Sequence, residues 1–386
     1  ANNVAVGSLA LDANTTASDN TAVGFASLGA NTTGTKNAAF GKDSGKAITT
    51  GNQNTALGAR SLQATTTAAH NTAIGEASLY TNTTGEWNTA VGSQSLVNNT
   101  TGSYNTAFGG GAMQAQTAGG NNCAFGYAAM YNSNNGSLVV RNTAMGYASL
   151  YQTTTDDNAA FGYYTLRVQT TGRRNTAIGG SSGVAMTTGS DNTFVGNEAG
   201  GTTTTGSANV LVGSSISTVS ATSSNTQGFG YDLTCSDNYT TIGQGTADIR
   251  AEHGVATWAT VSDERVKKDI EDATVGLEFI NDLRPVTFNY KNKGDLPTEF
   301  RGYEEGSTEV YKNSKSQHGF IAQEVKAAID KHSDIKDGFG MWDDNDETGQ
   351  QRVGETALIP MLTKAVQELS TQVDELKSEL LALKGE

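Results

Sequence analysis

Apolar residues recur at a fixed spacing along the first 215 residues, inside an otherwise small and polar sequence. Thirteen units each open on an asparagine; ten of the twelve steps between them are 17 residues long, and the other two are 20 and 16. A constant period of this length predicts a solenoid in which each unit forms one turn and the longer unit carries a loop. The opening residues are Asn3, Asn20, Asn37, Asn54, Asn71, Asn88, Asn105, Asn122, Asn142, Asn158, Asn175, Asn192 and Asn209.

Each unit repeats the same order of apolar, glycine and turn residues. The fourth position is apolar in all thirteen units, the fifth is always glycine, and the ninth is leucine or methionine in nine units. Many units carry Thr-Thr-Gly near position 14, which indicates a bend in which glycine supplies a positive φ. Because glycine, threonine and asparagine are poor helix residues, a helical solenoid is excluded. We expect two short strands and two bends in each unit.

Parallel stacking of the units would place neighbouring strands roughly 4.8 Å apart and make a rod on the order of 60 Å long. The opening asparagines would then form a ladder of side-chain amides along one corner. Three modest apolar side chains per unit bury too little surface to offset the ordering of 17 backbone units, at roughly 1 to 2 kcal/mol each. We therefore expect the turns to bury a second surface against copies of the same chain.

The C-terminal end follows a heptad pattern instead. Such a seam must face partner helices, so it predicts a coiled coil. Four heptads run without glycine until Gly385. Position a holds Ile359, Val366, Val373 and Leu380, and position d holds Leu362, Leu369, Leu376 and Leu383.

Charge divides the chain at about residue 250. Residues 1–250 hold 12 acidic and 9 basic residues, whereas residues 251–386 hold 27 and 16, and the formal net charge of the chain is -14. This balance argues against nucleic acid or an anionic membrane surface as a partner, because both attract clustered cations. Cys123 and Cys235 are too few and too far apart for a disulfide framework or a zinc site. No apolar run is long enough to span a membrane.

The repeat core Asn-Thr-Ala-Val/Ile-Gly and its spacing resemble the head repeats of trimeric autotransporter adhesins over about residues 1–215. This resemblance implies a parallel β-roll interlocked as a trimer. From Asn225 the pattern loosens, as expected of a cap or neck. The chain starts inside a repeat, so we expect an attachment region on its N-terminal side.

A second resemblance covers about residues 250–386. The block SDERVKKDI from Ser262, the block HGFIAQEV at 318–325 and the run ALIPMLTKAVQELSTQVDEL resemble the intramolecular chaperone domain of endosialidase tailspikes and other phage tail fibres. That family trimerises a β-fibre and then cuts itself off. The resemblance makes Ser262 the nucleophile, Lys267 its base, and the bond between Val261 and Ser262 the cleavage site.

Without the resemblance, the types and spacing of Ser262 and Lys267 do not decide whether this segment is catalytic. A Ser-Lys dyad needs a neutral amine, which requires desolvation or a nearby cation such as Lys268. Ser-Asp before an apolar-periodic run is also an ordinary helix N-cap, and Lys-Lys an ordinary surface pair. If the resemblance holds, the activity is that of a single-turnover, self-cleaving serine peptidase, and no turnover enzyme is expected in the repeats.

Two further candidates are not assigned to the dyad. His318 is interpreted as a structural, hydrogen-bonded histidine. The acidic stretch 342–350 imitates part of a calcium loop but has Thr348 where an EF-hand needs glycine. We therefore expect no metal and no cofactor.

The predicted fold is mainly β: a trimeric parallel β-roll or β-solenoid, then a smaller α+β chaperone domain and a coiled coil. The predicted parts are 1–224 (repeats), 225–261 (neck), 262–352 (chaperone) and 353–386 (coiled coil). β-Branched residues at a with leucine at d generally favour two strands, but both resemblances imply three, and we expect a homotrimer.

The leading functional hypothesis is a phage tail fibre or tailspike, assembled in the host cytoplasm and carried on the virion. Its further partners would be a host surface receptor, with carbohydrate as one option, and other tail proteins. One alternative is a bacterial trimeric adhesin, which would need a membrane anchor where this chain has a coil. Another is a carbohydrate depolymerase, but residues 1–250 show no recurring pair of carboxylates for glycoside hydrolysis.

Overall fold

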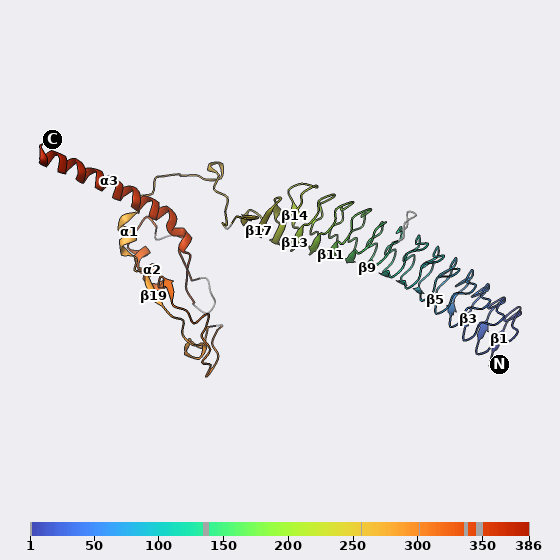
Figure 1. Ribbon diagram of the computed structural model, residues 1–386. Coiled ribbons are helices and arrows are strands. Elements are labelled where there is room, and N and C mark those ends of the chain that lie inside the picture. Colours follow the sequence, from blue (N-terminus) through green and yellow to red (C-terminus); the bar gives the residue numbers. More distant parts are fainter. Residues whose placement is uncertain are drawn as a thin grey trace. The chain divides into compact units, whose positions relative to one another are not determined.

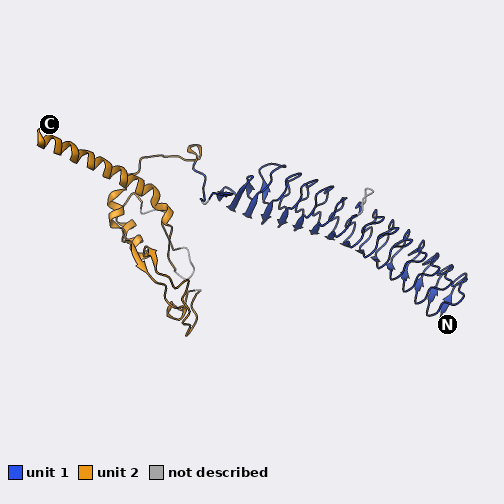
Figure 2. Ribbon diagram, viewed as in Figure 1, with its two compact units in different colours: residues 1–262 blue, residues 263–386 orange. Residues whose placement is uncertain are grey.

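The computed structural model describes residues 2–133, 139–255, 257–300, 302–335, 339–344 and 350–385. The chain forms two compact units, Ala1–Ser262 and Asp263–Glu386 (Figure 2). The predicted parts 1–224 and 225–261 both lie in the first unit, and the finer four-part division stays a prediction.

The first unit is a parallel β-solenoid with one short strand per turn (Figure 1). Successive strands pair in parallel, and the pairing joins equivalent repeat positions, such as Ala22 with Ala39. The turns contribute β1 (Val4–Val6), β2 (Thr21–Val23), β3 (Ala38–Phe40), β4 (Thr55–Leu57), β5 (Thr72–Ile74), β6 (Thr89–Val91), β7 (Thr106–Phe108), β8 (Cys123–Phe125), β9 (Thr143–Met145), β10 (Ala159–Phe161), β11 (Thr176–Ile178), β12 (Thr193–Val195) and β13 (Val210–Val212).

At its C-terminal end the solenoid has longer strands and ends in an antiparallel hairpin. β15 (Gln227–Tyr231) and β17 (Tyr239–Gln244) continue the parallel sheet, and β18 (Ala247–Glu252) pairs antiparallel with β17. A second small sheet joins β14 (Ser217–Thr218) to β16 (Thr234–Cys235). The parallel solenoid and its 17-residue period are as predicted. The second strand predicted for each unit was not found. Among the described residues, the rest of each regular turn consists of turns and bends.

Glycine at position 5 is required by how closely the turns approach. Gly75 has φ +130°, and a Cβ there would lie 2.6 Å from the carbonyl carbon and oxygen of Gly92 in the next turn. No side chain fits at that distance, and the positive φ already disfavours other residues. The glycine column therefore fixes the spacing of the stacked backbones.

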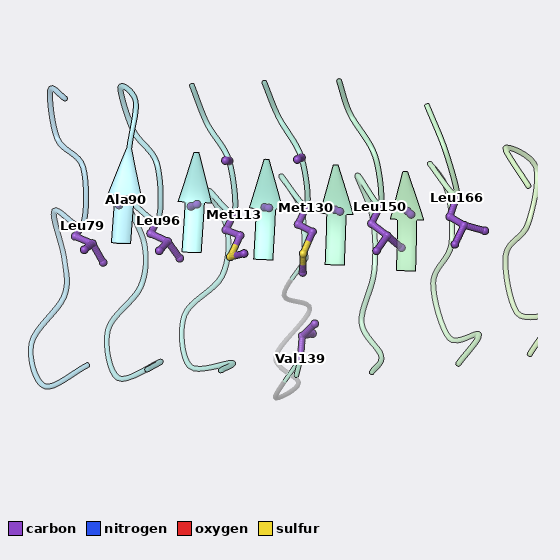
Figure 3. Close-up of a cluster of buried hydrophobic side chains, with 14 of the residues drawn as sticks. Leu79, Ala90, Leu96, Met113, Met130, Val139, Leu150 and Leu166 are labelled. Carbon is purple, nitrogen blue, oxygen red and sulfur yellow. The ribbon is translucent and has the colours of Figure 1, made fainter. Parts of the chain in front are cut away.

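The core of the first unit lies inside each turn and is built from two columns. The alanine in the middle of most strands is buried, as in Ala73 and Ala90, and the leucine or methionine at position 9 is buried beside it. Leu79, Leu96, Met113 and others project into the interior from successive turns (Figure 3). Where position 9 is glycine, as at Gly45, the buried side chain of Ile48 fills the space from position 12.

The opening asparagines form the predicted ladder. Asn71 Nδ2 donates to the carbonyl of Gly85 at 2.9 Å, and Asn71 Oδ1 accepts from the backbone N–H of Asn88 at 3.0 Å. The same pattern recurs from turn to turn among buried side chains. These bonds satisfy polar groups that would otherwise be buried without partners.

The apolar column at position 4 points out of the turn. Because side chains alternate along a strand, burying the alanine at position 3 turns position 4 outward. Leu57, Phe108, Phe125 and Met145 are each 45–47% exposed on the single chain. Phe108 and Phe125 stack with ring centroids 4.6 Å apart. The column predicted from the sequence is therefore a surface stripe and not the interior of the solenoid.

The second unit is a small α+β structure with a long C-terminal helix, as predicted. Its helices are α1 (Leu277–Asp282), α2 (Ala322–Asp330) and α3 (Leu358–Lys384), with short 3₁₀ turns η1 (Glu264–Val266), η2 (Lys293–Asp295) and η3 (Glu355–Ala357). Two antiparallel pairs join β19 (Val286–Phe288) to β20 (Gln317–Gly319) and β21 (Trp342–Asp343) to β22 (Arg352–Val353).

The core of the second unit packs the start of α3 against α1 and α2. Phe279, Val325, Ile329 and Leu358 are buried together. The Glu368 side chain of α3 accepts a hydrogen bond from the backbone N–H of Leu277 at 2.8 Å, which caps the first turn of α1. The first turns of α3 therefore belong to a folded core.

The rest of α3 has an exposed apolar seam. All eight predicted a and d residues are at least 45% exposed, from Leu362 at 45% to Leu383 at 85%. The helix ends on Gly385 in the left-handed conformation, with φ 71°. Within the described residues, no helix is both long enough and apolar enough to cross a membrane.

Candidate functional site

The chain reaches the candidate cleavage site through the hairpin that closes the solenoid. Arg250 of β18 donates its N–H to the carbonyl of Ala259 at 2.9 Å and accepts from the Ala259 N–H at 2.7 Å. This is the last backbone pairing of the first unit before the predicted scissile bond. The closing hairpin therefore anchors the peptide two residues before Val261.

The peptide around the scissile bond is exposed on the single chain. Trp258 is 54% exposed and Val261 is 62% exposed. The described residues from Glu252 to Thr274 are all exposed, so no core of one chain shields this segment. Its exposed apolar side chains offer a surface that other chains could cover.

Asp263, directly after Ser262, caps a single 3₁₀ turn. Its carboxylate accepts from the Arg265 backbone N–H at 2.9 Å and pairs with the Arg265 guanidinium at 2.9 and 2.5 Å. The hydrogen bonds from the Arg265 side chain and backbone lower the pKa of Asp263 to about 2. The N-cap interpretation of the sequence thus applies to Asp263, and Ser262 precedes the cap.

Lys267 ends the same turn. Its backbone N–H donates to the carbonyl of Glu264 at 3.0 Å, and its side chain is exposed. The neighbouring Lys268 ammonium lies 3.9 Å from the Asp269 carboxylate. Ser262 closes the first unit and Lys267 lies in the second, so the pairing of these two side chains as a dyad stays a prediction.

His318 lies in β20, away from the residues of the predicted dyad in sequence. Its Nδ1 is 3.1 Å from the Thr287 hydroxyl in the paired strand β19. It lines an open cavity of about 320 Å³ together with Phe320 and Glu355. The hydrogen bond is consistent with the structural role predicted for this histidine.

The acidic stretch 342–350 falls partly outside the described residues. Positions 345–349, including Thr348, are not described, so the question of a calcium loop stays open. Asp343, which is described, lies 3.9 Å from Arg352 in the paired strand. Among the residues that the structure describes, no three histidine, cysteine, aspartate or glutamate side chains gather into a possible metal site.

The chain thus combines a parallel β-solenoid with a small α+β unit whose long helix has an exposed heptad seam, and the class it defines is that of a β-solenoid protein with a separate C-terminal module. The C-terminal part can be assigned further. Residues 262–334 match the family model described as chaperone of endosialidase. With the long β-solenoid before it, this intramolecular chaperone segment is consistent with a phage tail fibre or tailspike.

The match begins at Ser262 and takes in both the Lys267 block and the HGFIAQEV block, so the chaperone resemblance is confirmed for this segment. Comparisons with curated proteins and with solved structures gave no match. The resemblance of the repeats to adhesin heads therefore stays a prediction.

Sequence reasoning missed the Asp263–Arg265 contact beside the predicted dyad. The signal was present as an acidic residue directly before the turn and a basic residue two positions later. It also missed the apolar groove of about 380 Å³ beside α3, lined by Leu283, Phe320, Leu362 and neighbours. Those residues are too far apart in sequence to form a recognisable motif.

Proposed function

We propose that this chain is a tail fibre or tailspike polypeptide whose second unit gathers three copies and then separates by cutting the bond before Ser262. The observation that carries the proposal is the chaperone-of-endosialidase match that starts at Ser262, where the β-solenoid unit ends in sequence. The family's association with trimer assembly supports three copies.

The seam of α3 supports association through parallel helices. In the heptad register, Glu379 occupies position g and Lys384 occupies position e of the next heptad. Parallel coiled coils pair these two positions between neighbouring helices, so the opposite charges favour parallel chains. A parallel arrangement would bring equivalent residues of each chain to the same level.

The solenoid supports association through its outward apolar stripe. A stripe that runs along the turns at position 4 is larger than the scattered apolar residues of ordinary protein surfaces. Three copies with their strand faces toward a common axis would cover it. This packing supplies the second buried surface that the composition of the repeats requires.

The cleavage step proposed here uses Ser262 and Lys267. The Lys267 amine takes the hydroxyl proton of Ser262, and Oγ attacks the carbonyl carbon of Val261. The bond between that carbon and the Ser262 nitrogen breaks, and the nitrogen leaves as an amine after receiving the proton. Water then hydrolyses the ester, releasing the Val261 carboxylate and restoring the Ser262 hydroxyl. The enzyme is its own substrate, so each chain reacts once.

Because the cleavage site is exposed in a single chain, we expect cleavage to depend on assembly. A lysine acts as a base only when its amine is neutral, and removal from water is one way to favour that form. The Lys267 side chain is exposed in the single chain. Neighbouring copies would supply the missing cover, so cutting would follow correct trimerisation. Release of the second unit would then leave the fibre kinetically trapped.

The self-cleavage test compares the unaltered chain with Ser262→Ala, Lys267→Met and a control at an exposed lysine of the same unit, Lys315→Met. Cutting before Ser262 gives pieces of 261 and 125 residues from the 386-residue chain. Intact mass spectrometry under denaturing conditions measures the pieces, and native mass spectrometry counts the chains.

We expect the two pieces from the unaltered chain and from Lys315→Met, and a single full-length trimer from Ser262→Ala and Lys267→Met. Cleavage that persists in Ser262→Ala would refute the mechanism. A monomer in the uncut Ser262→Ala variant would refute the assembly role.

The remaining part of the proposal is host attachment. The solenoid would serve as the shaft or receptor-facing part of a virion fibre, made in the host cytoplasm, with a host surface receptor as its partner. Adsorption assays with the purified trimer as a competitor of phage binding would test this part, because an attachment fibre should reduce adsorption in proportion to its concentration.

A further inference from the structure

Two exposed columns flank the strand face of every turn. The entry column consists of the residue directly before each opening asparagine, such as Trp87, and the exit column consists of the residue directly after each position-5 glycine, such as Ser93. Residues of both columns are mostly exposed on the single chain, including Trp87 at 50% and Tyr104 at 61%. The two columns border the apolar stripe on its opposite sides.

In the proposed trimer, the three-fold symmetry determines which surfaces of neighbouring copies are in contact. When three identical sheets face one axis, the leading edge of each sheet meets the trailing edge of the next, and the contact repeats around a closed ring. Three-fold symmetry also keeps equivalent residues at equal height along the axis. The entry residue of one strand therefore meets the exit residue of the same strand in a neighbouring copy.

We propose that the entry column of one copy packs against the exit column of the next, strand by strand, and that this contact sets the register of the trimer. The inference rests on the proposed homotrimer and names the pairing surfaces within it. Its occupant is a second copy of this chain.

Side-chain size supports the pairing. The bulky entry residue Trp87 flanks the same strand as the small exit residue Ser93, and Tyr104 flanks the same strand as Gly110. The atoms nearest to a Cβ built at Gly110 are two of the Tyr127 ring, at 3.4 and 3.5 Å. Because Gly110 has no side chain to cover that exposed ring, an aromatic ring from another copy would pack against Tyr127.

The polar residues also differ from couple to couple. On one strand the entry residue His70, which stacks on Trp87 within the chain, would meet the exit residue Glu76, which pairs with Arg60. A slip of one turn in either direction would set His70 against Ser93 or Ala59 instead. On another strand Arg141, whose guanidinium pairs with Asp157 within the chain, would meet Tyr147, and a guanidinium paired at its edge can still lie over a ring. The like-charged couple is Lys36 with Lys42, whose long side chains can diverge into solvent. Pairs that a slip would break give the repeats a register that their backbone pattern alone lacks.

Paired cysteines test the contact directly. In one chain, entry and exit residues of a strand lie six residues apart across an extended segment, roughly 15–20 Å. A disulfide needs Cα atoms within about 7 Å, so such a pair can close only between copies. The half-buried Cys123 is first replaced by threonine, the residue that most other units carry there, and the buried Cys235 is kept.

The test variant is Trp87→Cys with Ser93→Cys, and the matched control is Trp87→Cys with Gly110→Cys, which shifts the exit cysteine by one turn. Each trimer is oxidised, boiled in detergent without reductant and run on a gel, and its chain number is measured separately by native mass spectrometry. We expect a covalent trimer from the same-strand pair and single chains from the shifted pair and from each single-cysteine variant.

Three outcomes would overturn the inference or its basis. If the same-strand variant is a native trimer without cross-links, the edge pairing is contradicted and the proposed function is not. If the shifted variant cross-links and the same-strand variant does not, the proposed register of the trimer is wrong. A native monomer refutes the homotrimer itself, and with it the edge pairing.

Discussion

The two units place their apolar side chains in opposite ways. In the solenoid each turn encloses buried alanine and leucine columns, and backbone hydrogen bonds join every turn to the next. In the second unit the longest element, α3, has its a and d residues exposed over most of its length. The solenoid forms its turn-to-turn hydrogen bonds within one chain but leaves its position 4 stripe exposed, and α3 leaves its whole heptad seam exposed. In the proposed trimer, both exposed surfaces would be covered by other copies.

The largest expected effect comes from closing the space between turns. A Cβ at Gly109, where φ is +139°, would lie 2.3 Å from the Gly126 carbonyl oxygen, whereas one at the adjacent Gly110 would meet only ordinary contacts. We expect Gly109→Ala to destabilise the fold by about 4 kcal/mol or more, and Gly110→Ala by less than about 1 kcal/mol. Denaturant unfolding followed by circular dichroism measures both. Equal stability of the two variants would contradict this account of the glycine column.

Breaking the helical seam should separate association from folding of the solenoid. Val366→Asp with Leu369→Asp places carboxylates at positions a and d, which would be buried between helices. We expect loss of the trimer by light scattering. The control, Gln367→Asp with Thr371→Asp, adds the same charge to exposed residues on other faces of the helix and should remain trimeric. A trimer that survives the seam variant would show that α3 is not needed for association.

A smaller effect is expected from the asparagine ladder. Asn71→Ala removes the bonds to Gly85 and Asn88 and leaves a buried carbonyl and a buried N–H without partners. We expect a loss of about 1–3 kcal/mol. Asn98, an exposed asparagine of the next turn, serves as the control and should tolerate alanine within about 0.5 kcal/mol. The comparison is made by thermal unfolding at matched protein concentration, and equal losses would refute a structural role for the ladder.

The smallest expected effect is a pH dependence at η1. A carboxyl with a lowered pKa contributes stability that is present above its unfolded pKa and is lost as pH falls through the folded value. For Asp263 this window runs from about 3.9 down to about 2. Carbon-detected NMR titration should follow it, and Arg265→Ala should return the pKa toward its ordinary range. An unchanged pKa in that variant would show that Arg265 is not the cause.

The sequence predicted the features that depend on period and local chemistry. The 17-residue step predicted the parallel stacking, and the asparagines form the expected ladder, whereas the close backbone approach at the position 5 glycine became clear only in the structure. It did not reveal which side of each strand faces inward, because a three-residue strand alternates only once. The buried side is the alanine, a residue too small to stand out, and its burial sends the more apolar position 4 to the surface.

The candidate site was less accessible from sequence. Ser262 and Lys267 came from resemblance, because their types and spacing also fit an ordinary cap and a surface lysine. The structure shows the cap on Asp263 and the exposure of the surrounding peptide. Neither property follows from a local pattern, since both depend on which segments the fold leaves without cover.

The strand register continues unbroken through units of unequal length. Cys123 pairs with Thr143 across the 20-residue unit, and Thr143 pairs with Ala159 across the 16-residue unit. Each turn makes its contacts with the turns before and after it, so a gene duplication or deletion of whole turns would leave every remaining junction as it was. The length of the solenoid can thus change in steps of one turn without any change in the sequence of the second unit.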